Sequence, residues 1–149
     1  MPVQRDDPYR NFNFLVTWKD SPEGTSVLGG FSEVSGLGVE VGYVEYRNGN
    51  DKWLTPRKLP GLRHATDVTL KRGLIGAANL FNWIKTVGEG GGQPELVTIT
   101  LMDEERQPVT VWNLVDALPK KWTGPVLVAK GGGVAIEELV LVCRDLEMP

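Results

Sequence analysis

The sequence contains few of the residues that most often carry catalysis or bind metals. It has one cysteine, Cys143, and one histidine, His64. A single cysteine excludes an internal disulfide, which fits synthesis in a reducing compartment, and a single histidine excludes a histidine cluster around a metal. No apolar run approaches the roughly 18 residues that span a bilayer, and residues 1–11 lack the apolar core of a signal peptide. We therefore expect synthesis in the cytoplasm, without a signal peptide or membrane segment.

Length and composition indicate one ordinary globular domain covering residues 1–149. Of the 149 residues, 41% are hydrophobic and 23% are charged, and the formal net charge is −3. A chain of this length can bury a sizeable core. A slightly acidic chain gives no general reason to expect nucleic acid or an anionic membrane as its partner.

Alternating apolar residues predict strands in most of the chain. Phe12, Phe14, Val16 and Trp18 form one such pattern, and Val97, Ile99 and Leu101 form another. Further strands are expected at 27–35, 39–44, 67–71, 109–114 and 134–146. A loop is expected at 117–125.

The spacing of Ala77, Leu80, Phe81 and Ile84 predicts a single helix over 74–87, ended by the glycine run after it. About seven strands and one helix, without a βαβ rhythm, favour a mainly β fold. We expect an antiparallel sandwich or small barrel with the helix on one flank.

The segment from Tyr46 to Gly73 is the most unusual part of the sequence, because it is a long connection rich in basic, aromatic and proline residues. Compact domains seldom contain so long a connection unless it is functional or disordered. Trp53, Leu54, Leu59 and Leu62 argue against disorder. We interpret residues 46–65 as an arm that is ordered mainly by contact with a molecule outside its own subunit.

Two alternative functions use the same segment. Basic residues interleaved with Trp53 are typical of single-stranded nucleic-acid binding, although the chain has no recognisable nucleic-acid motif and is acidic overall. A small β-barrel enzyme or ligand-binding module could instead use His64 as a base beside Thr66 and Asp67. Sequence neighbours are weak support for a triad, which is defined by spatial roles. We therefore expect no catalytic residue.

Other reactive groups have simpler explanations. Cys143 lies in an expected strand, where a buried, inert thiol is the usual state, and Asp103, Glu104 and Glu105 do not have the spacing of a calcium loop. Trp18 and Trp83 are expected in the core. Trp53, Trp112 and Trp122 fall in or beside expected loops, where they mark either interfaces or satellites of the core.

Several segments follow one another in a specific order. They are DPYRNFNFLV, GGFSEVSGL, VEYRNGND, PRKLPG, VTLKRGL, KWTGP and VAIEELVLVCRDLE. Together they run from Asp7 to Glu147, and they resemble the tail tube proteins of contractile phages and phage-like contractile injection systems.

This resemblance implies a structural subunit that forms hexameric rings, which stack into a rigid hollow tube. Such a tube lies inside a contractile sheath and is driven, with its spike, through a target envelope. Its lumen carries protein payload or DNA. The implied partners are further copies of the chain, the sheath, baseplate and spike proteins, and terminator proteins. The resemblance implies no enzymatic activity, cofactor or metal.

The resemblance also places contacts between subunits and stacked rings in the N-terminal arm (1–10) and in the arm at 46–65. The implied interface residues are Asp7, Pro8, Tyr9, Tyr46, Arg47, Asn48, Gly49, Asn50, Lys52, Trp53, Pro56, Lys58, Leu59, Pro60 and Gly61. Thr98 and Thr100 alternate with apolar residues, and we expect them to line the lumen, because a transit channel should be hydrated.

Overall fold

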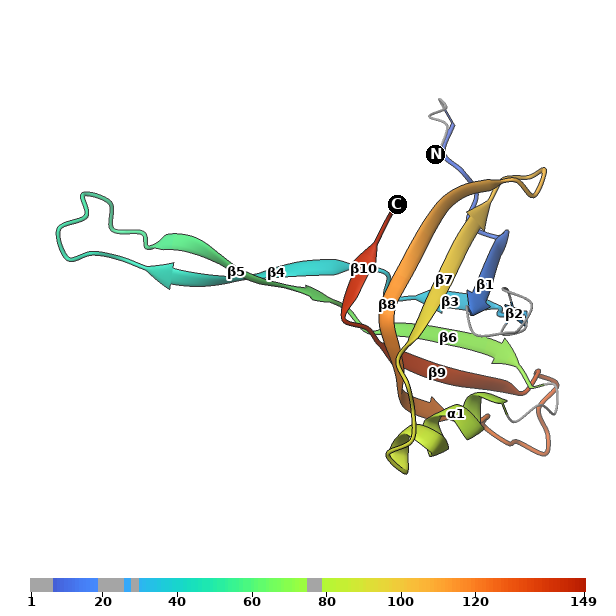
Figure 1. Cartoon of the computed structure of the whole chain (residues 1–149). Helices are drawn as coiled ribbons and strands as arrows, with labels where there is room; N and C mark the ends of the chain where they lie inside the picture. Colours follow the sequence, from blue (N-terminus) through green and yellow to red (C-terminus); the bar gives the residue numbers. More distant parts are fainter. Residues whose placement is uncertain (1–6, 19–25, 28–29, 75–78) are drawn as a thin grey trace.

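A computed structural model describes residues 7–18, 26–27, 30–74 and 79–149. Within these residues it contains ten strands and one helix (Figure 1). The elements are β1 (Phe14–Trp18), β2 (Ser26–Val27), β3 (Glu33–Ser35), β4 (Val39–Tyr46), β5 (Arg57–Ala65), β6 (Val68–Gly73), α1 (Asn79–Gly88), β7 (Glu95–Met102), β8 (Pro108–Thr123), β9 (Ile136–Val142) and β10 (Asp145–Glu147).

The body of the molecule is one antiparallel sheet that curls back on itself. Its strand order is β2-β1-β7-β8-β9-β6-β3, and β10 adds to β8. The 16-residue β8 makes the curl, because its first part pairs with β7 and its second part with β9. Asp116, at the junction, has a φ of 52°, a conformation that Asp tolerates better than most residues. The mainly β, antiparallel fold with one helix is therefore confirmed.

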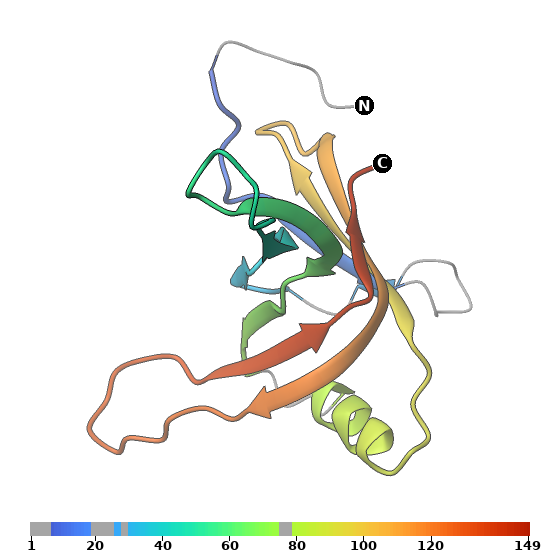
Figure 2. The ribbon, with the colours of Figure 1, turned by 90° about the vertical axis from the view of Figure 1, so that its left-hand side faces the viewer.

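The core lies inside this curled sheet. Alternate residues of β6, β7 and β9 point inward, among them Leu70, Val97, Leu139 and Leu141, which are fully buried. The helix α1 packs against β8 and closes one end of the body (Figures 1 and 2). Its buried stripe is formed by Leu80 and Trp83, with Val87 beside them.

The helix differs from the predicted one in two respects. Residues 75–78, including Ala77 of the predicted stripe, lie outside the described residues, and Leu74 lies before the helix in non-helical backbone. Phe81 is not in the core: it is 45% exposed and meets Trp122 edge-on, with ring centroids 5.3 Å apart. The apolar stripe is therefore centred on Leu80 and Trp83.

Other predicted elements also need correction. The expected loop at 117–125 belongs mostly to β8, because β9 supplies hydrogen-bonding partners for residues 118–123. The expected strand at 134–146 is two strands, β9 and β10, separated at Cys143 and Arg144. The expected strand at 27–35 is represented by the separate strands β2 and β3, with residues 28–29 outside the described ones.

Trp112 and Trp122 both lie in β8 and pack against the core. They are satellites of the core rather than loop residues, while Trp83 is buried as predicted. The side chain of Trp18 lies outside the described residues.

A buried ion pair connects two strands of the body. Arg72 on β6 and Glu137 on β9 are register partners, are 1% and 2% exposed, and form a charged hydrogen bond. The indole Nε1 of Trp122 donates to the second carboxylate oxygen of Glu137 at 3.2 Å, and the Arg72 guanidinium lies over the Phe31 ring. Buried charges of this kind need paired partners, and both Glu137 oxygens have one.

Candidate subunit interface on the β4–β5 hairpin

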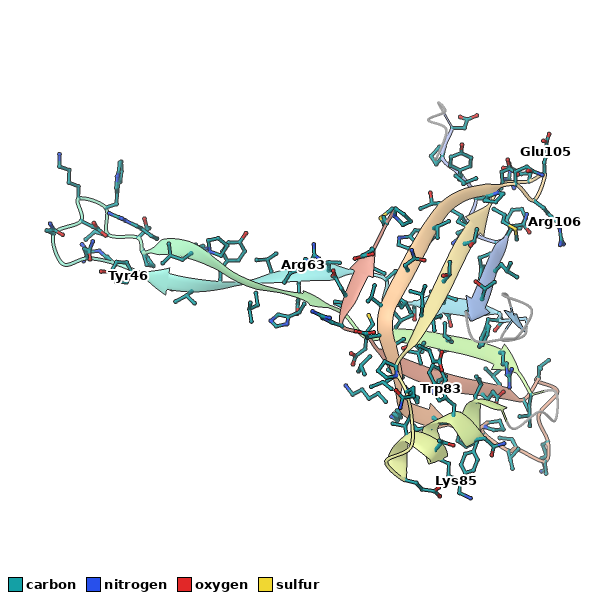
Figure 3. The ribbon with its side chains drawn as sticks, in the orientation of Figure 1. Tyr46, Arg63, Trp83, Lys85, Glu105 and Arg106 are labelled. Carbon is teal, nitrogen blue, oxygen red and sulfur yellow. The ribbon has the colours of Figure 1, made fainter. Side chains whose placement is uncertain are left out.

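The arm predicted from the sequence is a long β-hairpin. Strands β4 and β5 pair antiparallel in a two-stranded sheet of their own and project far from the body (Figure 1). Residues 57–65 are therefore a strand, and the interpretation of this part as an irregular connection was wrong. Figure 3 places Tyr46 near the tip of the hairpin and Arg63 near its base.

The hairpin has no face that the body covers. All eight residues of β4 and all of β5 except Ala65 are exposed. Its large apolar side chains nevertheless include Tyr43, Val44 and Leu62, which are 61%, 63% and 76% exposed. A two-stranded hairpin is marginally stable by itself in water, and large exposed apolar side chains gathered on one element often mark an interaction site. The hairpin thus has the composition of a surface that another molecule covers.

The base of the hairpin is held at a fixed bend. The Thr66 hydroxyl donates to the carbonyl oxygens of Gly36 and Gly38, and Gly36 has a φ of +88°. A Cβ on Gly36 would lie 2.1 Å from the Asp67 carbonyl oxygen, so only glycine fits. These contacts hold the backbone at the point where the hairpin leaves the body.

Ion pairs attach the same region to the body. Arg63 pairs with Asp145 of β10, and Lys120 of β8 pairs with Asp67 at 2.7 Å. These pairs are partly exposed, and exposed ion pairs contribute little to stability individually. They do fix geometry at the point from which the long hairpin projects.

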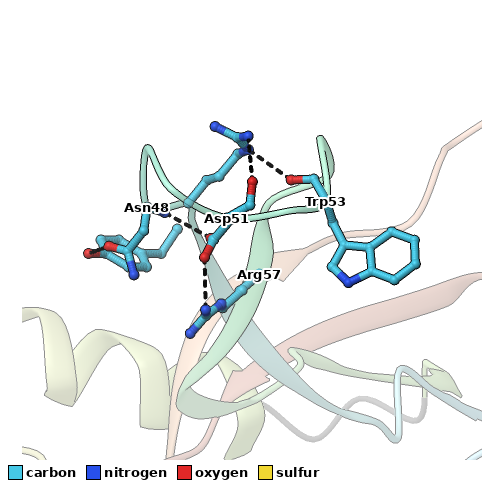
Figure 4. Close-up of polar contacts among 6 residues, drawn as sticks. Asn48, Asp51, Trp53 and Arg57 are labelled. Atoms are coloured by element: carbon cyan, nitrogen blue, oxygen red, sulfur yellow. Dashed lines mark hydrogen bonds and ion pairs between the residues drawn. The ribbon is translucent and has the colours of Figure 1, made fainter.

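The tip of the hairpin is ordered by its own polar contacts (Figure 4). Arg47 donates through Nε to the Trp53 carbonyl at 3.0 Å and through a terminal nitrogen to the Asp51 carbonyl at 3.2 Å. The Asp51 carboxylate accepts the Asn48 backbone N–H and pairs with Arg57, both at 2.9 Å. Four backbone and side-chain groups are thereby held in place before any partner binds.

This ordered tip presents two large apolar side chains to solvent. Trp53 is 79% exposed and Leu54 is 90% exposed. Because tryptophan is enriched among residues that dominate binding energy, a preformed loop that displays Trp53 is suited to act as an anchor. Asp51, Leu54 and Arg57, which build or accompany this tip, were not among the residues predicted from the sequence, although the turn-forming Asn-Gly-Asn-Asp run signals a turn there.

The predicted interface residues of the N-terminal arm lie before β1. Asp7 and Pro8 are exposed and Tyr9 is half-buried. They belong to the body, and the structure does not bring them to the hairpin tip, which lies on the far side of the molecule (Figure 1). The hairpin and the N-terminal segment are therefore two separate surfaces of the subunit.

Thr98 and Thr100 lie on the face of β7 that points away from the core. Thr98 is flanked by Thr17 of β1 and Asn113 of β8, and its hydroxyl donates to the Asn113 side-chain oxygen at 3.0 Å. Thr100 lies between Leu15 and Val111. The row of Thr17, Thr98 and Asn113 continues onto β10 with Glu147, the register partner of Asn113, so it is polar and carries one charge.

The residues considered for catalysis are not assembled into a catalytic site. His64 is exposed on β5 opposite Glu40, whereas the Thr66 hydroxyl is bonded to backbone carbonyls and Asp67 is paired with Lys120. Within the described residues, no group of three or more histidine, cysteine or acidic side chains could hold a metal ion.

Cys143 and the acidic turn have structural surroundings. Burial, together with the negative charges of Asp145 and Asp67, raises the pKa of the Cys143 thiol, which disfavours the reactive thiolate. The Asp103 carboxylate accepts the backbone N–H groups of Glu105 and Gln107 and so closes the β7–β8 turn. In the part of the chain that the structure describes, no helix is long and apolar enough to cross a membrane.

The subunit thus has a curled antiparallel body and a projecting hairpin whose apolar side chains are exposed to solvent. Residues 10–147 match the family model of the T4-like virus tail tube protein gp19. The chain therefore belongs to this tail tube family, which confirms the resemblance found in the sequence. It is a structural subunit of the inner tube of a contractile apparatus.

Solved structures agree with this assignment. A chain of an extracellular contractile injection system, the PVC sheath-tube complex in its extended state, is 27% identical, with 97% of this chain and 93% of that chain covered and a TM-score of 0.82. A chain of the anti-feeding prophage (AFP) baseplate is 26% identical, with 97% of both chains covered and a TM-score of 0.84. No curated protein matches the sequence significantly.

More distant structures share the fold. Hcp1 from Flavobacterium johnsoniae is 12% identical, with 90% of this chain and 94% of that chain covered and a TM-score of 0.52. The enzyme and nucleic-acid alternatives are not favoured by any of these similarities.

Proposed function

We propose that six copies of the chain form a ring, that rings stack into the inner tube, and that the β4–β5 hairpin makes the principal contact between copies. The observation that carries this proposal is the exposure of the hairpin: it displays apolar side chains along its length and a preformed tip around Trp53, with no cover from its own subunit. The proposed contacts use the tip and strand residues predicted from the sequence, from Tyr46 to Gly61. The N-terminal residues Asp7, Pro8 and Tyr9 add a second contact between copies.

Shortening the hairpin tests its role. Val44 and Leu59 are cross-strand partners, so residues 45–58 between them can be replaced by Asn-Gly, a pair that favours tight hairpin turns. We expect a folded subunit, with an unchanged circular dichroism spectrum, that forms neither rings nor tubes by negative-stain microscopy. Glu105→Ala, at the exposed β7–β8 turn, serves as a control that should assemble normally. Tubes formed by the shortened variant would refute the role of the hairpin.

The outer face of β1, β7 and β8 lines the lumen in this proposal. Its support is the polar row of Thr17, Thr98, Asn113 and Glu147, because a surface with such a row is hydrated. Thr98→Cys, made together with Cys143→Ser, provides a test. In tubes, a small maleimide should label Thr98→Cys readily and a maleimide carrying a long polymer should label it slowly. Equal labelling by both reagents would place this face outside the lumen.

The proposed partners are a contractile sheath, a baseplate with its spike, and a terminator. Support comes from the similar chains, which are described as parts of a PVC sheath-tube complex, an AFP baseplate and a PVC sheath/tube terminator. Sheath contraction would drive the tube through a target envelope. The protein itself then needs no catalytic activity, because its work is mechanical.

The cargo that we propose is protein rather than DNA. The similar chains at 26–27% identity come from an extracellular contractile injection system and the anti-feeding prophage, whereas gene transfer agent particles are similar at 10% identity. Purified particles should contain protein inside the tube and no nuclease-protected nucleic acid. Recovery of protected DNA would favour a DNA-carrying tail.

A further inference from the structure

The loop between β8 and β9 is a second exposed apolar surface, distinct from the hairpin. Its aliphatic side chains Val126, Leu127, Val128 and Val134 are 87%, 84%, 63% and 78% exposed. No other loop in the described residues displays so many aliphatic side chains to water. Surface of this kind is typical of a contact with another protein.

This loop also surrounds a cleft. The cleft has a volume of about 620 Å³ and is lined only by aliphatic residues and glycines of residues 126–135. Leu74 lies beside it, because its backbone N–H donates to the Ala135 carbonyl at 2.8 Å. An aromatic side chain fits a cleft of this volume and chemistry, and the absence of charged groups from its lining excludes a preference for ionic ligands.

The position of the loop relative to the hairpin indicates what fills the cleft. The hairpin tip and residues 124–135 lie at opposite ends of the molecule (Figure 1). When one surface of a subunit binds a different surface of the next copy, the contact is heterologous and repeats head to tail. A projecting apolar tip at one end and an apolar cleft at the other have the arrangement that such a polymer requires.

We propose that the hairpin tip of one copy inserts Trp53 into the apolar cleft of residues 126–135 on the next copy, where Leu54 packs against the rim. This proposal rests on the proposed role of the hairpin in assembly and adds the identity of the receiving site. The tip is held in shape by Arg47 and Asp51 before contact, so little of its flexibility is lost on binding.

A second cleft, on the body, provides a competing site. It has a volume of about 320 Å³ and lies between β1, β3 and β7, with Phe14 and Trp112 in its walls. Its lining also includes the polar groups of Asn11, Ser32 and Glu33. Burying an indole there would remove water from these groups without supplying hydrogen bonds to all of them. The 126–135 cleft has no polar side chain in its lining, so an indole bound there would cover backbone polar groups only.

Cross-linking between copies distinguishes the two clefts. In a Cys143→Ser background, Lys52→Cys is combined either with Val128→Cys in the proposed cleft or with Ser32→Cys in the competing one. Lys52 is exposed and lies next to Trp53, so the anchoring tryptophan is retained and tubes can form. Each pair is oxidised in assembled tubes and examined on a non-reducing gel. We expect a ladder of covalent multimers from the Val128→Cys pair alone. A ladder from the Ser32→Cys pair, or none from the Val128→Cys pair, would overturn the proposal.

An assembly measurement that does not depend on cysteine chemistry accompanies this test. Leu127→Asp places a charge in the loop without touching the core, since Leu127 is 84% exposed, and Leu127→Met keeps the apolar surface. We expect Leu127→Asp to raise the concentration needed for tube formation about tenfold or more, and Leu127→Met to leave it unchanged. Normal assembly of Leu127→Asp would overturn the proposal and assign the loop to another partner.

The hairpin proposal and this inference fail in different ways. If the shortened hairpin still forms tubes, the hairpin has no role in assembly. If shortening abolishes tubes while Leu127→Asp assembles normally, the hairpin retains its role and the receiving site lies elsewhere.

Discussion

Replacing Glu137 with leucine removes one member of the buried ion pair between β6 and β9. Arg72 and Glu137 are 1% and 2% exposed, so water cannot replace the lost carboxylate. Removing one partner of a buried pair typically costs about 3–5 kcal/mol, because the remaining charge stays buried. The Trp122 indole N–H also loses its acceptor. We expect a loss of about 4 kcal/mol, a large part of the roughly 5–15 kcal/mol that stabilises a typical domain.

The free energy of unfolding can be measured by urea denaturation followed by tryptophan fluorescence. Binding between copies stabilises the folded state by mass action, so the protein concentration must be one at which sedimentation shows only unassembled subunits. Glu137→Gln should lose less than Glu137→Leu, because its side-chain oxygen still accepts a hydrogen bond from Trp122.

The double variant Arg72→Met/Glu137→Leu provides the matched control. With both charges removed, most of the stability should return, since apolar replacements of buried pairs are often neutral or stabilising. A loss of less than about 1 kcal/mol for Glu137→Leu, or a double variant as unstable as the single one, would refute the assignment of this pair as a buried structural element.

Three further predictions concern the hairpin and the free thiol. Gly36→Ala should lower the free energy of unfolding, measured by urea denaturation, by about 1–3 kcal/mol. The reason is that its Cβ would lie 2.1 Å from a carbonyl oxygen at a φ of +88°. Gly49→Ala, with open space around its Cβ, should change the free energy of unfolding little. Asp51→Ala should raise the concentration needed for tube formation without changing the unfolding midpoint of the unassembled subunit, since Asp51 orders only the tip; equal assembly of Asp51→Ala and the unmodified protein would show that tip order is unimportant. The pH at which Cys143 reacts with iodoacetamide at half its maximal rate should be higher in the folded protein than in the denatured chain, because burial, Asp145 and Asp67 raise the pKa of the thiol.

The sign of the Cys143 effect on stability follows from the same shift. A thiol whose pKa is higher in the folded than in the unfolded state contributes stability that is fully present below the unfolded pKa. That contribution is lost as the pH rises through the folded pKa. Equal alkylation profiles for folded and denatured protein would contradict the raised pKa.

Regular side-chain alternation allowed much of the body to be predicted from the sequence. Val97 and Ile99 point to one side of β7 because successive side chains of a strand point to opposite faces, and both are buried as expected. The tail tube family was also apparent, because its segments occur in order from Asp7 to Glu147.

The two hairpin strands show weaker apolar alternation in the sequence, because the body covers neither of their faces. Arg57–Ala65 contains a proline, a glycine and several basic residues, which are poor strand formers. It becomes a strand because β4 supplies hydrogen-bonding partners, and Pro60 lies beside the register shift between Val41 and Tyr43. Prolines within sheets are found at such irregularities. In β8, Pro119 likewise lies beside a register shift in the pairing with β9.

The local chemistry of the chain determined the alternation of the body strands, the existence of one helix and the presence of an unusual arm. Only the tertiary structure decided which distant residues meet. Arg72 and Glu137 are 65 positions apart in the sequence, and from the sequence alone each charged residue is expected at the surface. The register of β6 and β9 places the two side chains opposite each other inside the core. In the same way, only the folding of the chain places the hairpin tip and the apolar 124–135 loop at opposite ends of one subunit, because their separation depends on how the whole sheet curls.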